Sequence, residues 1–157
     1  MRNINDFKFR GYDTEYEKMT YFDDEDYLLS YGQILRSKIE WNYDYDEERI
    51  GYEDVNNKII LMQYTGLHDK NGKEIYEGDA WEDEDGYYII VWDEKEAGFL
   101  VDTYGFEEWL GEGGQECYGN KIEFISREPI DYFDFSKIEI TKNIYDNPDL
   151  LEKGAEE

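Results

Sequence analysis

Residues 61–80 read LMQYTGLHDKNGKEIYEGDA, and this stretch decides the fold. Two runs within and beside it, 59–62 and 74–76, favour extended backbone, and the turn 69–72 (DKNG) lies between them. Asn and Gly tolerate the positive φ angles of a tight hairpin, so the sequence predicts strand, turn and strand here. Residues 77–79 (EGD) predict a second reversal directly afterwards. Two corners so close together are typical of a small β-barrel.

Further strands are predicted on both sides of this hairpin from alternating or continuous runs of aromatic and β-branched residues. They are 7–12, 19–21, 87–92, 99–104, 122–125 and 138–145. Residues 27–41 are open between helix and strand, because Leu28, Tyr31, Leu35 and Ile39 fall near helical spacing whereas Gly32 favours a strand. Residues 42–54 fit either a solvated loop or an exposed strand. Residues 106–110 fit one helical turn, and 111–114 (GEGG) fit a flexible tip.

A short terminal helix is predicted at the end of the sequence. Asn147 would supply its N-cap, Pro148 its first position and Asp149 an acid in its first turn. Gly154 would end it.

Residues 61–79 closely resemble the signature of the YopX family of bacteriophage and prophage proteins. Three further segments carry the same resemblance, namely Phe9-Arg10 with Tyr12-Asp13 and Lys18-Met19, Trp92-Asp93-Glu94 with Gly98-Phe99, and Asn143-Ile144-Tyr145-Asp146-Asn147-Pro148. Residues 24–57 and 105–120 depart from the family pattern. The resemblance implies an SH3-like barrel and a phage setting, and it implies no established biochemical activity.

We therefore expect a mainly β protein with minor α content. Its fold would be an SH3-like barrel of antiparallel strands with N-terminal strand additions and a short C-terminal helix. A length of 157 residues predicts one domain, or one domain and a satellite, and the resemblance implies a single YopX-like domain, 1–157. Within it we expect a strand and loop extension over 1–57 packed on the barrel, the barrel core over 58–146, and the helix and tail over 147–157.

The composition is strongly acidic and unusually aromatic. Asp and Glu number 41 against 16 Lys and Arg, which gives a net charge of -25, and aromatic residues make up 18% of the chain. The aromatic content argues against disorder, because such residues bury enough apolar surface to support a core. A single cysteine, Cys117, allows no internal disulfide, and the first ten residues show no apolar signal core. The sequence therefore predicts a protein of the host cell cytoplasm.

Tests for catalytic and cofactor motifs fail. Counted from Asp69 as a calcium loop, the required glycine position holds Glu74 and the twelfth position holds Ala80. The glycines of 111–114 lack the spacing of a dinucleotide or phosphate loop. His68 and Cys117 could in principle form a base and a nucleophile, but a single His in a polar turn is usually just exposed. Clusters of adjacent acids usually form a solvated face rather than a metal site. We expect no enzyme activity, no cofactor and no metal.

The charge itself points to a basic partner, because a protein this acidic is repelled by DNA and by anionic membranes. The candidate partner-binding residues are those of three acidic clusters, Asp23, Asp24, Glu25, Asp26, Asp44, Asp46, Glu47, Glu48, Glu82, Asp83, Glu84 and Asp85. The leading hypothesis is a non-enzymatic phage or prophage accessory protein that binds a basic host protein. It would act as a DNA mimic that inhibits a DNA-binding or anti-phage defence protein.

Three other hypotheses stay open. The acidity could serve only to keep a Tyr-rich barrel in solution. The chain could be a structural or homo-oligomerisation module that assembles through exposed Tyr and strand edges. It could also bind a small ligand or act as an enzyme in nucleotide metabolism, for which the sequence offers no catalytic constellation.

Overall fold

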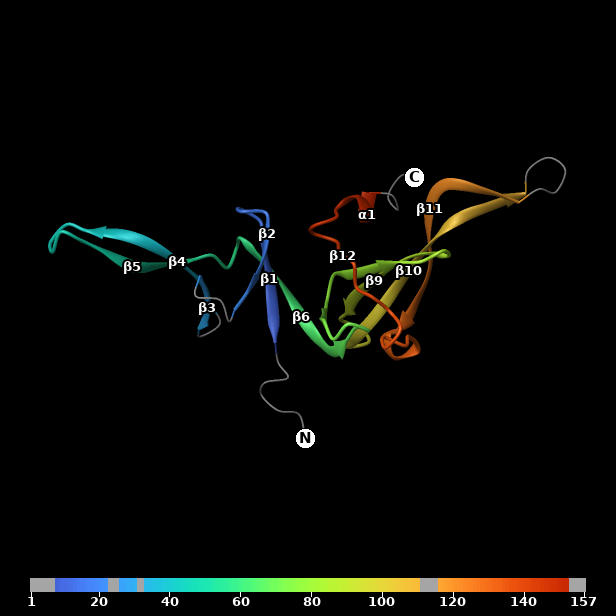
Figure 1. The fold of residues 1–157 in the computed structure, drawn as a ribbon, viewed down its shortest axis with the longest axis horizontal. Helices are drawn as coiled ribbons and strands as arrows, with labels where there is room; N and C mark the ends of the chain where they lie inside the picture. Colours follow the sequence, from blue (N-terminus) through green and yellow to red (C-terminus); the bar gives the residue numbers. More distant parts are fainter. Residues whose placement is uncertain (1–7, 23–25, 31–32, 111–115, 153–157) are drawn as a thin grey trace, which may run out of the picture. The chain divides into compact units, whose positions relative to one another are not determined.

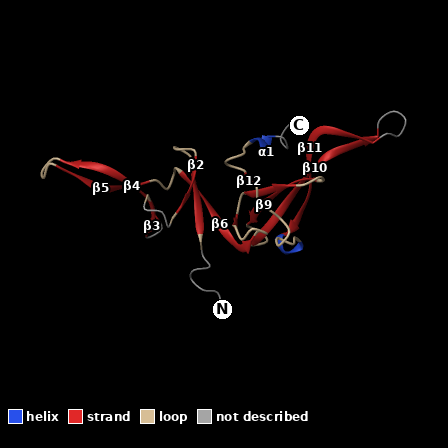
Figure 2. Ribbon diagram, in the orientation of Figure 1, coloured by secondary structure: helices blue, strands red, loops and turns tan. Residues whose placement is uncertain are grey.

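A computed structural model describes residues 8–22, 26–30, 33–110 and 116–152 of the chain (Figure 1). The chain forms two compact units, Met1–Gln63 and Tyr64–Glu157. Strands dominate the described residues (Figure 2). The predicted mainly β fold of antiparallel strands with a short C-terminal helix is confirmed, as curled sheets that form a half-barrel.

The first unit contains two small antiparallel sheets. Its strands are β1 (Phe9–Asp13), β2 (Lys18–Tyr21), β3 (Tyr27–Ser30), β4 (Gln33–Asn42), β5 (Glu47–Asp54) and the first half of β6 (Ile59–His68). Strand β1 lies between β2 and β6, and β4 lies between β3 and β5. A core of Tyr27, Ile34, Val55 and Ile59, with Phe22 packed against it, holds this unit together.

The ambiguous segment 27–41 is extended, as β3 and β4. Ile34 and Arg36 are buried while Leu35 and Ser37 are half-buried, which is the two-residue period of a strand. The helical spacing of the apolar residues does not decide the outcome, because antiparallel pairing of Tyr27 with Arg36 selects the strand. The predicted loop or exposed strand at 42–54 is a short turn followed by the exposed strand β5.

The second unit is built on a five-stranded antiparallel sheet with the order β11-β10-β9-β8-β12. Its strands are β8 (Asp79–Glu82), β9 (Gly86–Asp93), β10 (Gly98–Leu110), β11 (Glu116–Pro129) and β12 (Lys142–Asn143). The short strand β7 (Glu74–Tyr76) pairs instead with β6. Ile89 and Ile90 point to opposite faces of β9, and both are buried. Each face has its own core, one with Trp81 and Val101 and one with Tyr87. This is why 87–92 is a continuous apolar run in the sequence.

The signature hairpin fixes its own geometry through two buried carboxylates. The Asp69 Oδ1 atom accepts the backbone N–H groups of Asn71 and Lys73 at 2.8 and 2.9 Å, and Gly72 has the positive φ of 81° that the turn needs. The other Asp69 oxygen accepts the N–H of Ile140 at 3.1 Å. Burial favours the neutral form of Asp69, but these three backbone donors outweigh it and hold the pKa below the usual value for Asp.

The second corner repeats the same device. Gly78 has a φ of 79°, and Asp79 accepts the N–H of Tyr76 at 2.9 Å and the side-chain amide of Asn143 at 3.3 Å. Asp69 and Asp79 therefore join the central stretch to residues near the end of the chain. Both acids have a structural role.

Two local predictions need correction. Residues 106–110 are strand and not a helical turn, because the ladder to β11 continues through them after a register shift. The strand predicted over 138–145 shrinks to Lys142–Asn143, since the backbone before it is held by the signature hairpin. The terminal helix α1 (Asp149–Glu152) is present. The backbone oxygen of Asn147 accepts the N–H of Leu150 at 3.0 Å, and its side chain accepts the N–H of Asn143 at 3.2 Å. Gly154 and the tip 111–114 lie outside the described residues.

Candidate partner-binding site

Among the described residues, no group of three His, Cys, Asp or Glu lies close enough to hold a metal ion. His68 is exposed, and its ring lies 3.3 Å from the Tyr64 hydroxyl. Cys117 lies in β11, in register with Trp109 of β10. None of the described helices has the length and apolarity needed to span a membrane.

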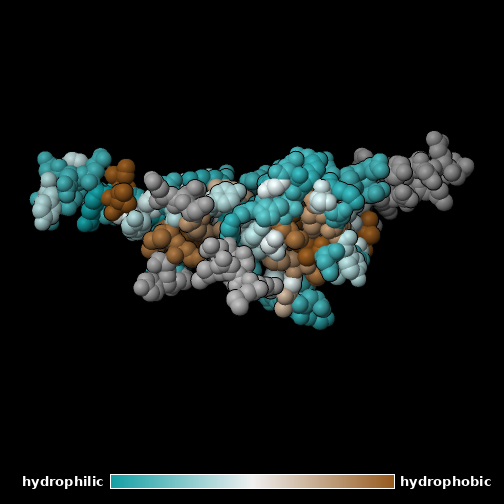
Figure 3. All heavy atoms as spheres, turned by 60° about the horizontal axis from the view of Figure 1, so that its bottom comes forward, coloured by the Kyte–Doolittle hydropathy of each residue, from teal (hydrophilic) through white to brown (hydrophobic). Residues whose placement is uncertain are grey.

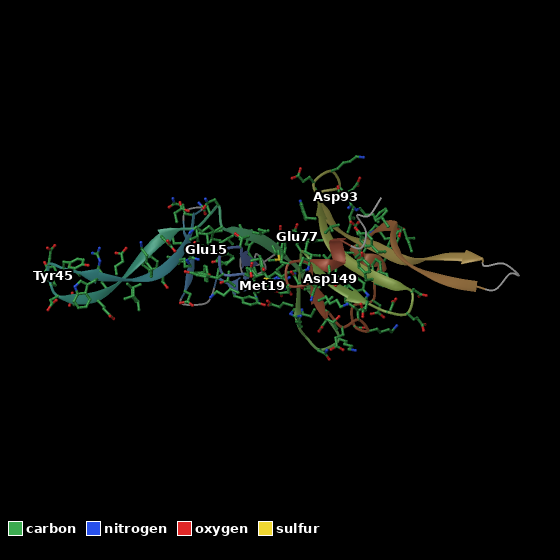
Figure 4. The ribbon with its side chains drawn as sticks, turned by 90° about the horizontal axis from the view of Figure 1, so that it is seen from above. Glu15, Met19, Tyr45, Glu77, Asp93 and Asp149 are labelled. Atoms are coloured by element: carbon green, nitrogen blue, oxygen red, sulfur yellow. The ribbon has the colours of Figure 1, made fainter. Side chains whose placement is uncertain are left out.

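A two-stranded projection of the first unit presents the most exposed aromatic side chains. We call residues 37–52 the ribbon: the outer parts of β4 and β5 and the turn between them. Its tip is the turn 43–46, which forms because Asn42 accepts backbone N–H groups of the turn and Asp46 adopts a positive φ of 53°. Figure 4 places Tyr45 at the far end of the ribbon. Tyr43 and Tyr45 are 87% and 76% exposed.

Four of the candidate acids lie at or beside this tip. They are Asp44, Asp46, Glu47 and Glu48, and all are exposed. None of the four forms an ion pair with another residue in the part of the chain that the structure describes. The tip therefore combines unneutralised carboxylates with two Tyr rings that are open to solvent.

The two faces of the ribbon differ sharply. On one face Glu40 bridges Lys38 at 3.0 Å and Arg49 at 3.2 Å, so charges there are largely neutralised. The hydrogen bonds and charges of Lys38 and Arg49 lower the pKa of Glu40, and burial, which acts in the opposite direction, does not outweigh them. The other face carries Ile39 in register with Ile50, and the neighbouring pairs are Trp41 with Glu48 and Ser37 with Tyr52. Figure 3 shows this ribbon as teal atoms with a distinct brown patch.

A buried charge network anchors the ribbon to the first unit. Arg36 of β4 donates to Asp13 of β1 at 2.9 Å, to Glu53 of β5 at 2.8 Å, and to Glu15. The Tyr27 hydroxyl donates to the same Asp13 carboxylate at 2.7 Å.

Asp13 is fully buried, and burial favours its neutral form. The hydrogen bond from Tyr27, two backbone N–H groups and the Arg36 charge outweigh that cost and lower the pKa of Asp13. Burial and the bond to Asp13 raise the pKa of Tyr27 to about 12. The network is therefore charged, paired and structural.

The remaining candidate acids lie elsewhere. Asp26 is exposed directly before β3, and Asp23, Asp24 and Glu25 lie outside the described residues. Residues 82–85 are exposed in the second unit, with Glu82 at the end of β8 and 83–85 in the turn to β9. Glu82 pairs with Lys142, and Asp83 accepts the Tyr88 hydroxyl at 3.2 Å. The structure thus gathers four acids at the ribbon tip and four at the β8–β9 turn, each within its own unit.

A shallow cavity of about 590 Å³ in the second unit is a candidate site for a small ligand. Asp93, the last residue of β9 and labelled in Figure 4, lines it together with Phe99 and Arg127. Arg127 is already paired with Asp102 at 2.7 Å and with Asp93 at 3.1 Å. Its charge is neutralised within the protein. The other charged lining residues, Lys95 and Glu96, are exposed and of opposite sign, so the cavity has no net charge of its own to select a ligand.

The apolar face of the ribbon was not predicted from the sequence. Ile39 and Trp41 alternate before the turn, and Ile50 and Tyr52 alternate after it. This two-residue period on both sides of the turn was a usable signal. The dense acids between them obscured it.

The chain was compared with known proteins. A family model described as YopX protein matches residues 8–152. A solved structure, the crystal structure of protein EF1440 from Enterococcus faecalis, is 22% identical to this chain and covers 92% of it and 97% of itself, with a TM-score of 0.39. No curated protein matches.

Proposed function

Because this chain belongs to the YopX family, we propose that it is a non-enzymatic phage or prophage accessory protein that binds a basic protein surface through its ribbon tip. The partner is a DNA-binding or anti-phage defence protein of the host cell, met in the cytoplasm. The observation that supports this proposal is the tip itself, where four unpaired acids surround the two most exposed Tyr rings.

The two kinds of tip residue contribute differently. An exposed ion pair is worth about 0–1 kcal/mol, so Asp44, Asp46, Glu47 and Glu48 mainly speed the encounter with a basic surface and orient it. A Tyr ring that becomes buried against an Arg or Lys side chain adds cation–π attraction and apolar contact, and residues of this kind often cost ~2 kcal/mol or more when removed. Tyr43 and Tyr45 would therefore carry most of the affinity, and the acids most of the selectivity.

DNA mimicry is the finer form of the proposal. The partner's positive surface is then the one that holds phosphates, which in a duplex carry one charge per ~1.7 Å of axis. The acidic tip competes with DNA for that surface. The net charge of -25 acts in the same direction, since it attracts basic proteins and repels nucleic acid and anionic lipid.

Charge reversal at the tip tests the proposal. Replacing Asp44, Asp46 and Glu47 together by Lys is expected to weaken binding to the captured partner by ~10-fold or more at ~50 mM salt, because both steering and contact are lost. The partner is first captured from a bacterial host lysate on the immobilised chain, identified by mass spectrometry, and then titrated by calorimetry. Binding of the unchanged chain should weaken as salt rises to ~200 mM, and duplex DNA should compete.

A matched control carries the same change in net charge elsewhere. Glu94, Glu96 and Asp131 are exposed residues of the second unit outside the candidate site, and their joint replacement by Lys should affect binding much less. Equal weakening by both triple variants would show that only the overall charge matters. A partner that binds the chain and DNA at the same time would exclude DNA mimicry.

The non-enzymatic part of the proposal has its own test. Changing His68 and Cys117 to Ala together should leave partner binding and any effect on the partner's DNA binding unchanged, since neither side chain belongs to the tip. Both are measured by titration and by a DNA competition assay. Loss of the effect in a variant with an unchanged circular dichroism spectrum would contradict it.

A further inference from the structure

The two sides of strand β4 exchange apolar and charged character along its length. At its inner end Ile34 and Arg36 face the core of the first unit and are buried. Side chains alternate along a strand, so Lys38 and Glu40 continue the same side outward, and this side is charged. The opposite side begins half-buried at Leu35 and Ser37 and becomes apolar at Ile39 and Trp41. Burial within the first unit would require the opposite arrangement.

The apolar side is open to solvent. Ile39 and Ile50 are 75% and 69% exposed, and Trp41 and Tyr52 are 47% and 55% exposed. These four side chains form one contiguous surface, because Ile39 pairs with Ile50 and the other two lie in the adjacent pairs. We call this surface the stem face.

From these observations we propose that the stem face is a homodimer interface, on which the same face of a second copy packs. Four such side chains, half to three-quarters exposed, present roughly 500 Å², so two copies cover about 1,000 Å² in total. That area is at the lower bound for a specific interface. Two-stranded ribbons with one apolar face stack in this way in β-sandwiches.

The local charge permits self-association even though the whole chain carries -25. The paired stem, residues 35–41 and 48–54, holds three basic and four acidic residues, namely Arg36, Lys38, Arg49, Glu40, Glu48, Glu53 and Asp54. It is close to neutral, and three of the four unpaired acids stand beyond it at the tip. The fourth, Glu48, lies at the outer end of the stem, in register with Trp41. Repulsion at the contact itself is therefore limited to Glu48, and most of the repulsion arises between the more distant charges.

Repulsion between tips also selects the orientation. A two-fold axis across the ribbon places the two tips at opposite ends of the dimer, whereas an axis along the ribbon would bring them together. The register then sets Ile39 and Ile50 of one copy over the same pair of the other. Trp41 of each copy lies over the partner pair Ser37 and Tyr52, where the small Ser leaves room for the indole. Both tips stay free, so the dimer does not rest on the proposed function.

Sedimentation equilibrium of the full chain tests the dimer. We expect a monomer–dimer equilibrium that tightens as salt rises from ~50 to ~500 mM, because screening weakens the repulsion between two acidic copies. Replacing Ile39 and Ile50 together by Ser should raise the dissociation constant by ~100-fold or more, since four apolar side chains leave each interface. The matched control replaces Tyr43 and Tyr45 by Ser at the tip, and its dissociation constant should stay within ~3-fold of the unchanged chain.

The outcomes separate the dimer from the partner site. A chain that is monomeric at all concentrations and salts, or a dimer that survives in the Ile39→Ser, Ile50→Ser variant, overturns the proposal. So does equal weakening by the tip control. Binding to a basic partner depends on salt in the opposite sense and is lost with the tip variants, so failure of one proposal leaves the other standing.

Discussion

Replacing Gly86 by Ala is expected to destabilise the second unit by about 3–5 kcal/mol, the largest effect of any single added methyl group in the described residues. Gly86 begins β9 with a φ of 156°, and an added Cβ would lie 2.0 Å from the backbone oxygen of Tyr104. Overpacking costs about 1–3 kcal/mol when side chains can move, and backbone strain adds a similar amount. At Gly86 the added Cβ would meet backbone atoms of β10, because Gly86 is in register with Gly105 of that strand. The clash can be relieved only if β9 and β10 separate.

Urea unfolding of the variant and of two control variants measures this effect. Gly72→Ala meets no atom within 4 Å and pays only for its positive φ of 81°, about 1 kcal/mol. Gly78→Val is intermediate, at about 1–3 kcal/mol, because a Cβ there meets Asn143 and Ile144 at 3.3 Å. Hydrogen exchange should show the loss of protection in β8, β9 and β10. A Gly86 variant as stable as the Gly72 variant would mean that the β9–β10 contact is wrongly described.

Replacing Arg36 by Ala is expected to destabilise the first unit by about 3–5 kcal/mol. Removal of one partner from a buried ion pair leaves an uncompensated charge, here on Asp13, which is fully buried. The Tyr27 hydroxyl and two backbone N–H groups still reach Asp13, so the loss should fall short of complete unfolding. The control is Arg49→Ala in the ribbon, whose exposed pair with Glu40 is worth ~1 kcal/mol or less.

The pH dependence of the same network has a definite sign. The pKa of Asp13 is lower in the folded chain, so its charge stabilises the fold at pH values above the ordinary pKa of Asp. That contribution is lost as pH falls through the ordinary value toward the folded one. Other carboxyl groups act in the opposite sense, because their protonation relieves repulsion within a chain of net charge -25. In the difference in stability between the unchanged chain and Asp13→Asn, the contributions of most other carboxyl groups cancel. This difference should shrink below about pH 4. A difference that stays constant down to about pH 2 would contradict the role given to Asp13.

Local chemistry explains why the hairpin and the acidic tip could be predicted from sequence. Asn71-Gly72 and the glycine of the second corner set their own turns, and the exposed acids of the tip need no partner to be located. The long-range partners could not be predicted. Nothing near Asp69 in the sequence indicates that Ile140 donates to it, and nothing near Asp13 indicates Arg36.

Tertiary pairing also overrode local preference. Residues 106–110 fit a helical turn when considered alone, but they lie beside β11, which pairs with four of the five residues. The stem face was missed for a related reason. Its four residues are separated by the acidic turn in the sequence and meet only when β4 and β5 pair.

The signature residues have structural roles, and this bears on what relatives that share the signature have in common. Four of them, Asp69, Gly72, Gly78 and Asp79, close a corner or hold residues 140 and 143 in place. Selection on these residues is therefore selection for a stable scaffold, and it places no constraint on the ribbon, whose residues bond elsewhere. Substitutions in the ribbon leave these bonds intact, so membership of the family predicts a shared architecture and does not by itself predict a shared binding target.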